Sequence, residues 1–468
     1  MISKLKKVGQ IIPKNSKNIK KSKIGLGFEK LDRNVFDPEK AYDKVAEAGV
    51  KWARLQSGWS RTEKEKGVYD FEWIDKIVNN FVERGIEPWV CLCYGNAIYN
   101  KEAEKVFGAV GCPPIFTDEQ KKGWESYVKA FVKHFEGRVN YYEVWNEPDG
   151  KWCWKHGPNA TELGLFTRDT GKYIKEVNPN AKVIGGVICS RNLAYLSEAF
   201  ETGMGDYLDF VSFHEYTNDE TKVFETVEAF TELAHYYNPK IRLIQGESGS
   251  QSRTGGHGAL WSAGWTEEIQ AKQLARHTIA DLMSGVHFTS YFSCMDMIEA
   301  LNGTVGDTNS YLDYGYFGVL GAEFDENGKS VGTYYKKPSY YVLQNICSIF
   351  AGDFELCKMP LTFWNMESDL TMDHDLKRTQ VVAGGFKNKS GRVFAYWYPS
   401  NILKTSVDTV RKMVFCTEYD KFRVVDVMDG SIYEIPEEMI ERKGHGVYRI
   451  NDMPVKDTPL LLVTGDFI

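Results

Sequence analysis

Two carboxylates stand directly after apolar segments that have the composition of buried β-strands. Glu147 follows the segment Val139–Trp145 after Asn146, and Glu247 follows the segment Ile241–Gln245 after one glycine. Glycosidic bonds are cleaved by such a pair of carboxyl groups, one of which serves as acid and then base while the other serves as nucleophile. The two segments therefore predict carbohydrate chemistry, provided that the fold brings their ends together.

Three further polar residues stand at the ends of other strand-like segments. Arg54 lies near the end of the segment Val50–Gln56, and His214 and Tyr216 follow the segment Phe210–Phe213. A guanidinium group beside a carboxylate favours the ionised form of that carboxylate, and a tyrosine hydroxyl could orient a nucleophile. We expect these three side chains to lie at the same face of the fold as the two carboxylates.

Strand-like segments alternate with segments of helical hydrophobic period over the first three quarters of the chain. The eight expected strands are Lys23–Phe28, Val50–Gln56, Pro88–Cys93, Val139–Trp145, Val183–Ile188, Phe210–Phe213, Ile241–Gln245 and Phe288–Phe292. The expected helices are Glu39–Ala48, Phe71–Arg84, Asp118–His134, Thr161–Val177, Lys222–Tyr236 and Glu267–Ser284. This alternation predicts an α/β fold, a closed (β/α)8 TIM barrel, with the active site at the carboxyl ends of its strands.

The chain changes character at about Gly352. The short segments expected as strands beyond it are Val381–Phe386, Val393–Tyr398, Val414–Phe415, Phe422–Val427, Ile432–Ile435, Tyr448–Ile450 and Leu460–Val463. Turn signals such as Asp429-Gly430 separate them, which is typical of an all-β module. We expect a catalytic barrel over residues 22–350 and a smaller carboxyl-terminal β-sandwich over residues 351–468.

The first 21 residues are basic, yet they contain a short β-type run at Val8–Ile12. A solvated tail would not need three large apolar residues there. The outer strands of the carboxyl-terminal sandwich need partners, because an open sheet edge invites aggregation. We therefore expect an amino-terminal strand from residues 1–21 to pair with the sandwich.

The composition limits the classes of partner. A net charge of −7 and a pI near 5.8 argue against a nucleic-acid binder, which needs a basic face. No apolar run approaches the roughly 18 residues of a membrane span, and no secretory signal is recognisable. The nine cysteines show no C-x-x-C spacing, which indicates a reduced protein. We expect a cytoplasmic protein with no nucleic-acid or membrane partner, and its oligomeric state stays open.

Motifs for other chemistry are incomplete. The run Gly25–Lys30 lacks the third glycine of a dinucleotide fingerprint, and Gly246–Ser250 misses the serine-hydrolase motif by its last residue. No cluster of histidines or carboxylates has the sequence spacing of a metal site. The sequence therefore predicts no metal and no cofactor.

Tryptophans are frequent in the segments that follow the expected barrel strands. Trp59, Trp152, Trp154, Trp261 and Trp265 lie there with neither helical nor strand period. We expect at least two of them to line the cleft, with their flat faces available for stacking on sugar rings. The alternative is that they pack as core at the top of the barrel.

Taken together, these motifs resemble those of the clan A retaining glycoside hydrolases, most closely family 39, the β-xylosidase and α-L-iduronidase family. The similar segments are Trp145–Pro148, Gly246–Ser248, Asp209–Tyr216, Ser290–Phe292 and Gly315–Leu320. The resemblance covers about residues 22–350. It implies a barrel with a double-displacement mechanism, in which Glu147 is the acid/base and Glu247 is the nucleophile.

The same resemblance implies further contacts with the substrate. Asn146 would contact the sugar 2-hydroxyl, and Arg54, His214 and Tyr216 would support the two carboxylates. Two positions depart from the pattern of the family and alter the subsite next to the scissile bond. Gln56 stands where the family often has histidine, and Phe292 stands where it often has a tryptophan floor.

The sequence thus predicts a retaining O-glycosidase acting on an oligosaccharide or glycoside. The other residues expected to bind substrate are Trp59, Trp152 and Trp265. Two alternatives stay open: a non-catalytic carbohydrate-binding barrel, and a transglycosylase that uses the same carboxylates. The residues name neither the sugar nor the anomer.

Overall fold

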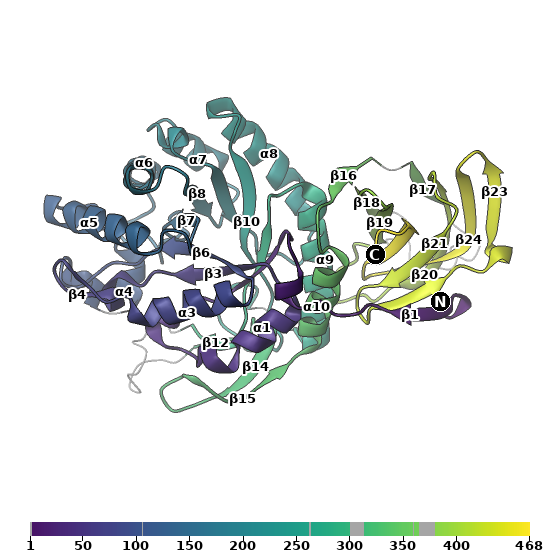
Figure 1. Ribbon diagram of the computed structural model, residues 1–468, viewed down its shortest axis with the longest axis horizontal. Helices are drawn as coiled ribbons and strands as arrows, with labels where there is room; N and C mark the ends of the chain where they lie inside the picture. Colours follow the sequence, from purple (N-terminus) through teal and green to yellow (C-terminus); the bar gives the residue numbers. More distant parts are fainter. Residues whose placement is uncertain (1, 105, 262–263, 300–312, 359, 365–379) are drawn as a thin grey trace.

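Eight parallel strands form a closed barrel in the computed structural model, which describes residues 2–104, 106–261, 264–299, 313–358, 360–364 and 380–468 (Figure 1). The barrel strands are β2 (Ile24–Gly27), β3 (Trp52–Gln56), β6 (Glu87–Leu92), β7 (Tyr141–Val144), β8 (Lys182–Ile188), β9 (Phe210–His214), β10 (Arg242–Ser248) and β11 (Thr289–Tyr291). They follow one another around the barrel in chain order, and β11 closes on β2. The expected TIM barrel is confirmed.

Helices surround the barrel. They are α1 (Tyr42–Ala48), α3 (Glu72–Glu83), α5 (Asp118–His134), α6 (Ala160–Val177), α7 (Leu193–Phe200), α8 (Lys222–Tyr237), α9 (Glu267–Ser284) and α10 (Pro338–Ile349). Shorter elements in the connections are α2 (Trp59–Thr62), α4 (Val106–Gly111) and the hairpins β4 (Glu63–Glu65) with β5 (Val68–Tyr69), β12 (Met297–Ile298) with β13 (Tyr314–Gly315), and β14 (Leu320–Phe324) with β15 (Ser330–Lys336). Helix α3 buries Ile74, Ile77, Val78 and Phe81 at helical spacing, which explains why its sequence was recognisable.

Large apolar side chains fill the amino-terminal half of the barrel interior. They form one cluster: Trp52, Trp89, Ile184, Phe210, Ile244 and Phe288. The rings of Trp52 and Phe288 stack with their centroids 4.5 Å apart. Because this layer closes one end of the barrel, the polar residues of the strands gather at the carboxyl ends.

The carboxyl-terminal part is a sandwich of two antiparallel sheets (Figure 1). The seven-stranded sheet has the order β1-β22-β21-β25-β19-β18-β16, and the four-stranded sheet has the order β17-β20-β24-β23. Their strands are β1 (Lys6–Gln10), β16 (Glu355–Cys357), β17 (Leu361–Trp364), β18 (Val382–Lys387), β19 (Gly391–Trp397), β20 (Asp408–Cys416), β21 (Phe422–Asp426), β22 (Ser431–Glu434), β23 (Ile440–Gly444), β24 (Val447–Lys456) and β25 (Leu460–Gly465). The predicted sandwich is confirmed, although β16, β17 and β23 were not expected from the sequence.

The first strand of the chain belongs to this sandwich. Strand β1 pairs antiparallel with β22, and Gln10 lies opposite Ser431. Val8 and Ile12 are exposed, whereas Leu5 is buried in the sandwich core and Ile11 in the main core. The strand thus lies two residues earlier than the expected run. The domain boundaries at residues 22 and 351 stay a prediction.

The sandwich contacts the barrel beside the loop between β9 and α8. Glu220 of that loop accepts hydrogen bonds from Trp397 Nε1 at 2.6 Å and pairs with Arg276 Nη2 at 2.7 Å. Arg276 of α9 also donates to the carbonyl oxygen of Ser400 at 2.9 Å. All three side chains are buried, so the two parts meet through a polar contact that excludes water.

Among the residues that the structure describes, no helix combines the length and the apolar character needed to span a bilayer.

Candidate active site

Glu147 lies on a turn that directly follows β7. The backbone at Trp145 and at Glu147 is left-handed, with φ values of 66° and 43°, a conformation that costs free energy for residues other than glycine. Two contacts hold it: Trp145 Nε1 donates to the carbonyl oxygen of Cys153 at 2.9 Å, and the Glu147 amide donates to that of Val187 at 3.0 Å. The turn directs the Glu147 carboxylate toward the barrel mouth rather than along the strand.

Glu247 reaches the same place from within β10. The register between β10 and β9 shifts between Gln245 and Glu247, which sets Glu247 beside His214. His214 Nδ1 lies 3.0 Å from Glu147 Oε1 and 3.6 Å from Glu247 Oε2. One oxygen of each carboxylate and one nitrogen of His214 lie within 4.8 Å of one another. The fold therefore brings the two predicted carboxylates together.

Arg54, on β3, is the buried cation of the site. Its Nη1 donates to Glu247 Oε2 at 2.7 Å, and its Nη2 donates to Asn146 Oδ1 at 2.8 Å. The same guanidinium contacts Glu143 Oε1, with Nε at 3.1 Å. Because a planar guanidinium can donate in several directions at once, Arg54 fixes the side chains of Glu247, Asn146 and Glu143 together.

Tyr216 holds the other oxygen of Glu247. Its hydroxyl donates to Glu247 Oε1, so both oxygens of this carboxylate have a donor. Burial raises the pKa of Tyr216 well above its ordinary value, and the neighbouring carboxylates of Glu247 and Glu147 add to the effect. The phenol therefore stays protonated and can only donate to Glu247.

Burial and two hydrogen-bond donors act in opposite directions on the pKa of Glu147. Burial raises this pKa, but hydrogen bonds from His214 and Trp152 outweigh burial and lower it. In turn, burial lowers the pKa of His214, but Glu247 and Glu147 outweigh this and raise it. The two shifts have opposite directions and a common cause, the contact between His214 Nδ1 and Glu147 Oε1.

Gln56 and Phe292 lie near the site but make contacts with the chain itself. Gln56 Oε1 accepts from Arg33 Nη2 at 2.6 Å and from the Lys30 amide at 3.0 Å. Gln56 Nε2 donates to the hydroxyl of Tyr94 at 3.1 Å. Phe292 is buried, with Lys30 Nζ 5.7 Å from the centroid of its ring.

Of the five loop tryptophans, Trp59, Trp154 and Trp265 are buried, whereas Trp152 and Trp261 are exposed. Trp59 is completely buried between aromatic rings and donates to Glu63, so the expectation that it binds substrate was wrong. Trp265 is 2% exposed and was likewise wrongly expected in the cleft. Both side chains pack as core although they lie in loops, because burying their large apolar area stabilises the fold. Trp152 is 44% exposed and donates to Glu147 Oε2 at 2.7 Å.

Two carboxylates at the site were not recognised from the sequence. Glu143 is buried within β7 beneath Arg54, and Trp89 Nε1 donates to its Oε2 at 3.0 Å. Glu29 follows β2, and its Oε1 lies 3.5 Å from Arg54 Nη1. Burial raises the pKa of Glu29 to about 8, although Arg54 opposes this shift. Glu29 could have been recognised from the sequence because it follows a strand. Its segment, Gly25–Lys30, was instead interpreted as an incomplete glycine motif.

Two groups of side chains have the composition of metal ligands. The first is Glu147, His214 and Glu247, but donors from Arg54, Tyr216 and Trp152 already contact their oxygens. The second is Glu102, Cys112 and His156. There the ammonium group of Lys155 contacts Glu102 and supplies the positive charge.

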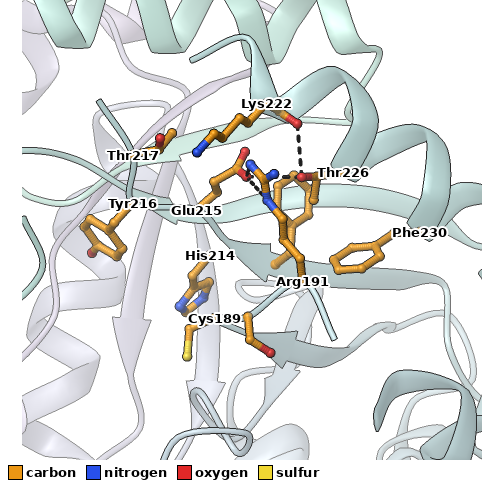
Figure 2. Close-up of a pocket in the computed structure, with 11 residues that line it drawn as sticks. Cys189, Arg191, His214, Glu215, Tyr216, Thr217, Lys222, Thr226 and Phe230 are labelled. Atoms are coloured by element: carbon orange, nitrogen blue, oxygen red, sulfur yellow. Dashed lines mark hydrogen bonds and ion pairs between the residues drawn. The ribbon is translucent and has the colours of Figure 1, made fainter. Parts of the chain in front are cut away.

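A cavity of about 280 Å³ opens beside the site, over the ends of β8 and β9 (Figure 2). Its walls include His214 and Tyr216, which also contact the two carboxylates. Arg191 crosses it and donates to Glu215 Oε1 at 2.7 Å. The cavity thus adjoins the carboxylate pair on the side of strands β8 and β9.

The fold and the site together define a class: a (β/α)8 barrel with paired carboxylates at its mouth. The family described as "Glycosyl hydrolases family 39" matches residues 44–240, a stretch that contains Glu147 and His214 and ends before Glu247. A β-xylosidase of Geobacillus stearothermophilus is 30% identical over 162 residues, which are 33% of this chain and 32% of that protein. The β-galactosidase BgaA of Clostridium cellulovorans is 28% identical over 149 residues, 28% of this chain and 22% of that protein.

Solved structures share the fold over nearly the whole chain. A family 39 glycoside hydrolase from Bacteroides cellulosilyticus WH2 has a TM-score of 0.63 at 19% identity, covering 98% of this chain and 83% of its own. A family 39 β-xylosidase from Caulobacter crescentus has a TM-score of 0.56 at 16% identity, covering 98% and 99%.

These matches confirm the resemblance expected from the motifs: the chain is similar to glycoside hydrolase family 39 in its barrel sequence and in its fold. The chain spans about a third of the length of the β-xylosidase that it matches and about a fifth of the β-galactosidase.

Proposed function

We propose that this protein is a retaining O-glycoside hydrolase, with Glu147 as acid/base and Glu247 as nucleophile. The observation that carries the proposal is the pair of carboxylates with oxygens within 4.8 Å of each other. Retaining enzymes hold their carboxyl groups about 5–5.5 Å apart, whereas inverting enzymes leave about 6.5–9.5 Å for a water molecule. The short separation supports direct attack by a carboxylate.

In the first step, Glu247 attacks the anomeric carbon and the bond to the leaving-group oxygen breaks. Arg54 and Tyr216 each donate a hydrogen bond to Glu247 and fix the direction of its oxygens. Glu147 gives a proton to the departing oxygen, so the leaving group departs as a neutral alcohol. The product of this step is a glycosyl ester on Glu247.

In the second step, a water molecule attacks the anomeric carbon and the ester bond to Glu247 breaks. Glu147 takes a proton from that water and returns to its starting state. His214 Nδ1 lies 3.0 Å from Glu147 Oε1, where it stabilises the negative charge of Glu147 whenever that carboxyl group is ionised. Each displacement inverts the anomeric centre, so the configuration of the substrate is kept.

Asn146 supports binding of the glycone. Its Oδ1 accepts from Arg54, which leaves the amide nitrogen pointing away from the guanidinium. That nitrogen has only a long contact of 3.6 Å, to Cys153 Sγ. A hydroxyl at sugar carbon 2 would be a stronger acceptor, and we assign Asn146 to that contact.

A panel of nitrophenyl glycosides that begins with β-xylosides and β-galactosides tests the proposal. Glu247→Ala should abolish turnover of every substrate, because no other group can form the glycosyl ester. Glu147→Ala should retain turnover of dinitrophenyl glycosides, whose leaving groups need no proton, and azide should accelerate it. Glu268→Ala, on the exposed face of α9, is the matched control.

Two results would contradict the mechanism. A product of inverted configuration, seen by NMR during hydrolysis, would exclude a glycosyl ester. Binding of oligosaccharides with no turnover of any glycoside would favour a carbohydrate-binding barrel instead.

A further inference from the structure

Both oxygens of Glu147 are occupied by nitrogen donors. His214 Nδ1 lies 3.0 Å from Oε1, and Trp152 Nε1 donates to Oε2 at 2.7 Å. An acid catalyst has to present one oxygen to the glycosidic oxygen, within hydrogen-bond distance. Each oxygen can accept in about two directions, and a leaving group that approaches along the direction now used by His214 or Trp152 has to displace that donor.

The two donors differ in how easily they can leave. The His214 side chain is fully buried at the end of β9, where it also approaches Glu247. Trp152 is 44% exposed, on the turn after β7. Moving an exposed indole costs little burial, whereas moving His214 would disturb both carboxylates. The contact that breaks is the one with Trp152.

The backbone around Trp152 is fixed, so the side chain is the part that moves. The Gly150 amide donates to the carbonyl oxygen of Glu147 at 3.0 Å, and the amides of Cys153 and Trp154 donate to that of Gly150, each at 3.0 Å. Trp154 is buried and its Nε1 donates to Glu162 Oε2 at 3.0 Å. Trp152 is thus an exposed side chain between anchored neighbours.

Gly150 provides the place where the indole rests. A Cβ atom added at Gly150 would collide with the ring carbons of Trp152. The backbone at Gly150 lies outside the left-handed region, so an alanine could adopt the same backbone conformation. The nearest atoms that its Cβ would meet belong to the indole of Trp152. Glycine at this position allows the ring to lie against the turn with its N–H on Glu147.

We propose that Trp152 is a gate on the proton donor: its indole holds Glu147 Oε2 while the site is empty, and an entering leaving group displaces it. The proposal rests on the acid/base role of Glu147. The leaving group would enter from the cavity over β8 and β9. Cys189, in the wall of that cavity, donates its amide to Asp149 of the same turn at 3.0 Å. Trp152 is a positioning residue in this scheme.

Displacement of the indole also changes the proton affinity of Glu147. Besides Trp152, the titratable and charged groups that face this carboxylate are His214 on β9, Arg54 on β3, Glu247 on β10, the phenol of Tyr216 after β9, and the thiols of Cys153 and Cys189. None of them has to move when Trp152 leaves. Loss of a donor to the ionised form raises the pKa of Glu147, so the leaving group itself favours the acid form that it needs.

Two variants remove the contact by different routes. Trp152→Phe keeps an aromatic ring but has no N–H, and Gly150→Ala pushes the intact indole off Glu147. In both, the alkaline limb of kcat/KM for phenyl glycosides should move up by about 1–2 pH units, the shift expected for one lost hydrogen bond to a charged group. With dinitrophenyl glycosides of the same sugar, the limb should not move. Trp364→Phe, on the exposed face of β17, is the control.

A second measurement does not depend on turnover. In the ligand-free protein labelled with ¹³C at glutamate carboxyls, the pKa of Glu147 should rise in Trp152→Phe and in Gly150→Ala, but not in Trp364→Phe. An unchanged pKa and an unchanged alkaline limb would overturn the gate. If no glycoside is turned over but the pKa rises, the proposed function fails while the contact between Trp152 and Glu147 stands.

The displacement itself is seen with ¹⁵N-labelled tryptophan. In Glu247→Ala, titration with a phenyl glycoside of the sugar identified by the panel should shift the indole resonance that Trp152→Phe removes. A glycoside that binds without shifting this resonance would show that the gate stays closed, and the proposal would be wrong.

Discussion

Glu247 and Glu147 face each other across His214, yet they are held in opposite ways. Glu247 is part of β10, and both of its oxygens accept hydrogen bonds, one from the buried Arg54 and the other from the partly buried Tyr216. Glu147 lies on a turn with left-handed backbone, and one of its two donors is the exposed Trp152. One carboxylate is fixed by strands and a buried cation, and the other by a turn and a movable side chain.

This difference matches what each group has to do in the proposed mechanism. A nucleophile needs one charge state and one direction, and preorganised donors supply both without rearrangement during the reaction. An acid/base changes its protonation twice in each cycle, so a partner that can leave is useful to it. The comparison predicts that substitutions on the Glu247 side act on stability and rate together, whereas those on the Glu147 side act mainly on pH dependence.

The largest effect should come from Arg54→Met. Glu143 and Glu247 would lose their cation while still buried, which typically costs about 3–5 kcal/mol of stability. We expect a clear fall in the melting temperature together with loss of turnover on every substrate. Arg392→Met, which breaks an exposed ion pair with Glu418 in the sandwich, is the control and should change neither. A variant that melts like the wild type would show that Arg54 does not fix the Glu247 side.

Tyr216→Phe should have an intermediate effect. A hydrogen bond to a charged group contributes about 1.5–3 kcal/mol, so kcat should fall about 10–150-fold while the melting temperature changes little. Good and poor leaving groups should be affected alike, because the nucleophile serves both. Tyr237→Phe, whose hydroxyl donates to Glu201 at 2.6 Å, is the control. A loss confined to poor leaving groups would place Tyr216 on the acid side instead.

The effect of Glu29→Gln should be the smallest of the three at pH 5, and it should grow with pH. Because the folded protein holds the pKa of Glu29 near 8, above the ordinary value of 4.5, the stability that the protonated group provides is complete below about pH 4.5 and is lost as the pH rises through 8. Glutamine does not ionise. The melting temperature of the variant relative to the wild type should therefore increase from pH 5 to pH 8.5, measured by thermal unfolding. A difference that is constant across this range would mean that Glu29 is ionised throughout.

The barrel could be predicted because its strands and helices differ in period. Segments such as Glu72–Glu83 carry apolar residues on one helical face, and the barrel strands are continuous apolar runs. Strands β16, β17 and β23 were missed because most of their residues are exposed or half-buried, so they lack an apolar pattern. Pairing with a neighbouring strand, rather than burial, forms them.

The site was predictable where a residue stands at or just beyond the carboxyl end of a strand, as His214, Glu247 and Glu147 do. Glu143 was missed because it lies inside a strand, where a carboxylate is not expected without a buried cation such as Arg54. Trp59 and Trp265 were misplaced because their burial depends on neighbours distant in sequence. The contact between Glu147 and His214 joins two residues that are 67 positions apart in the sequence, so no local pattern could predict it.

The pairing of β1 with β22 has a consequence for biosynthesis. Gln10 contacts Asp429 across 419 positions of the chain, so the first strand leaves the ribosome long before its partner exists. At roughly 5–20 residues per second, β1 waits about 20–80 seconds for β22. The barrel can be complete during that time, but the sandwich cannot. Three lysines in the first seven residues keep the waiting edge charged, which protects it from pairing with another nascent chain.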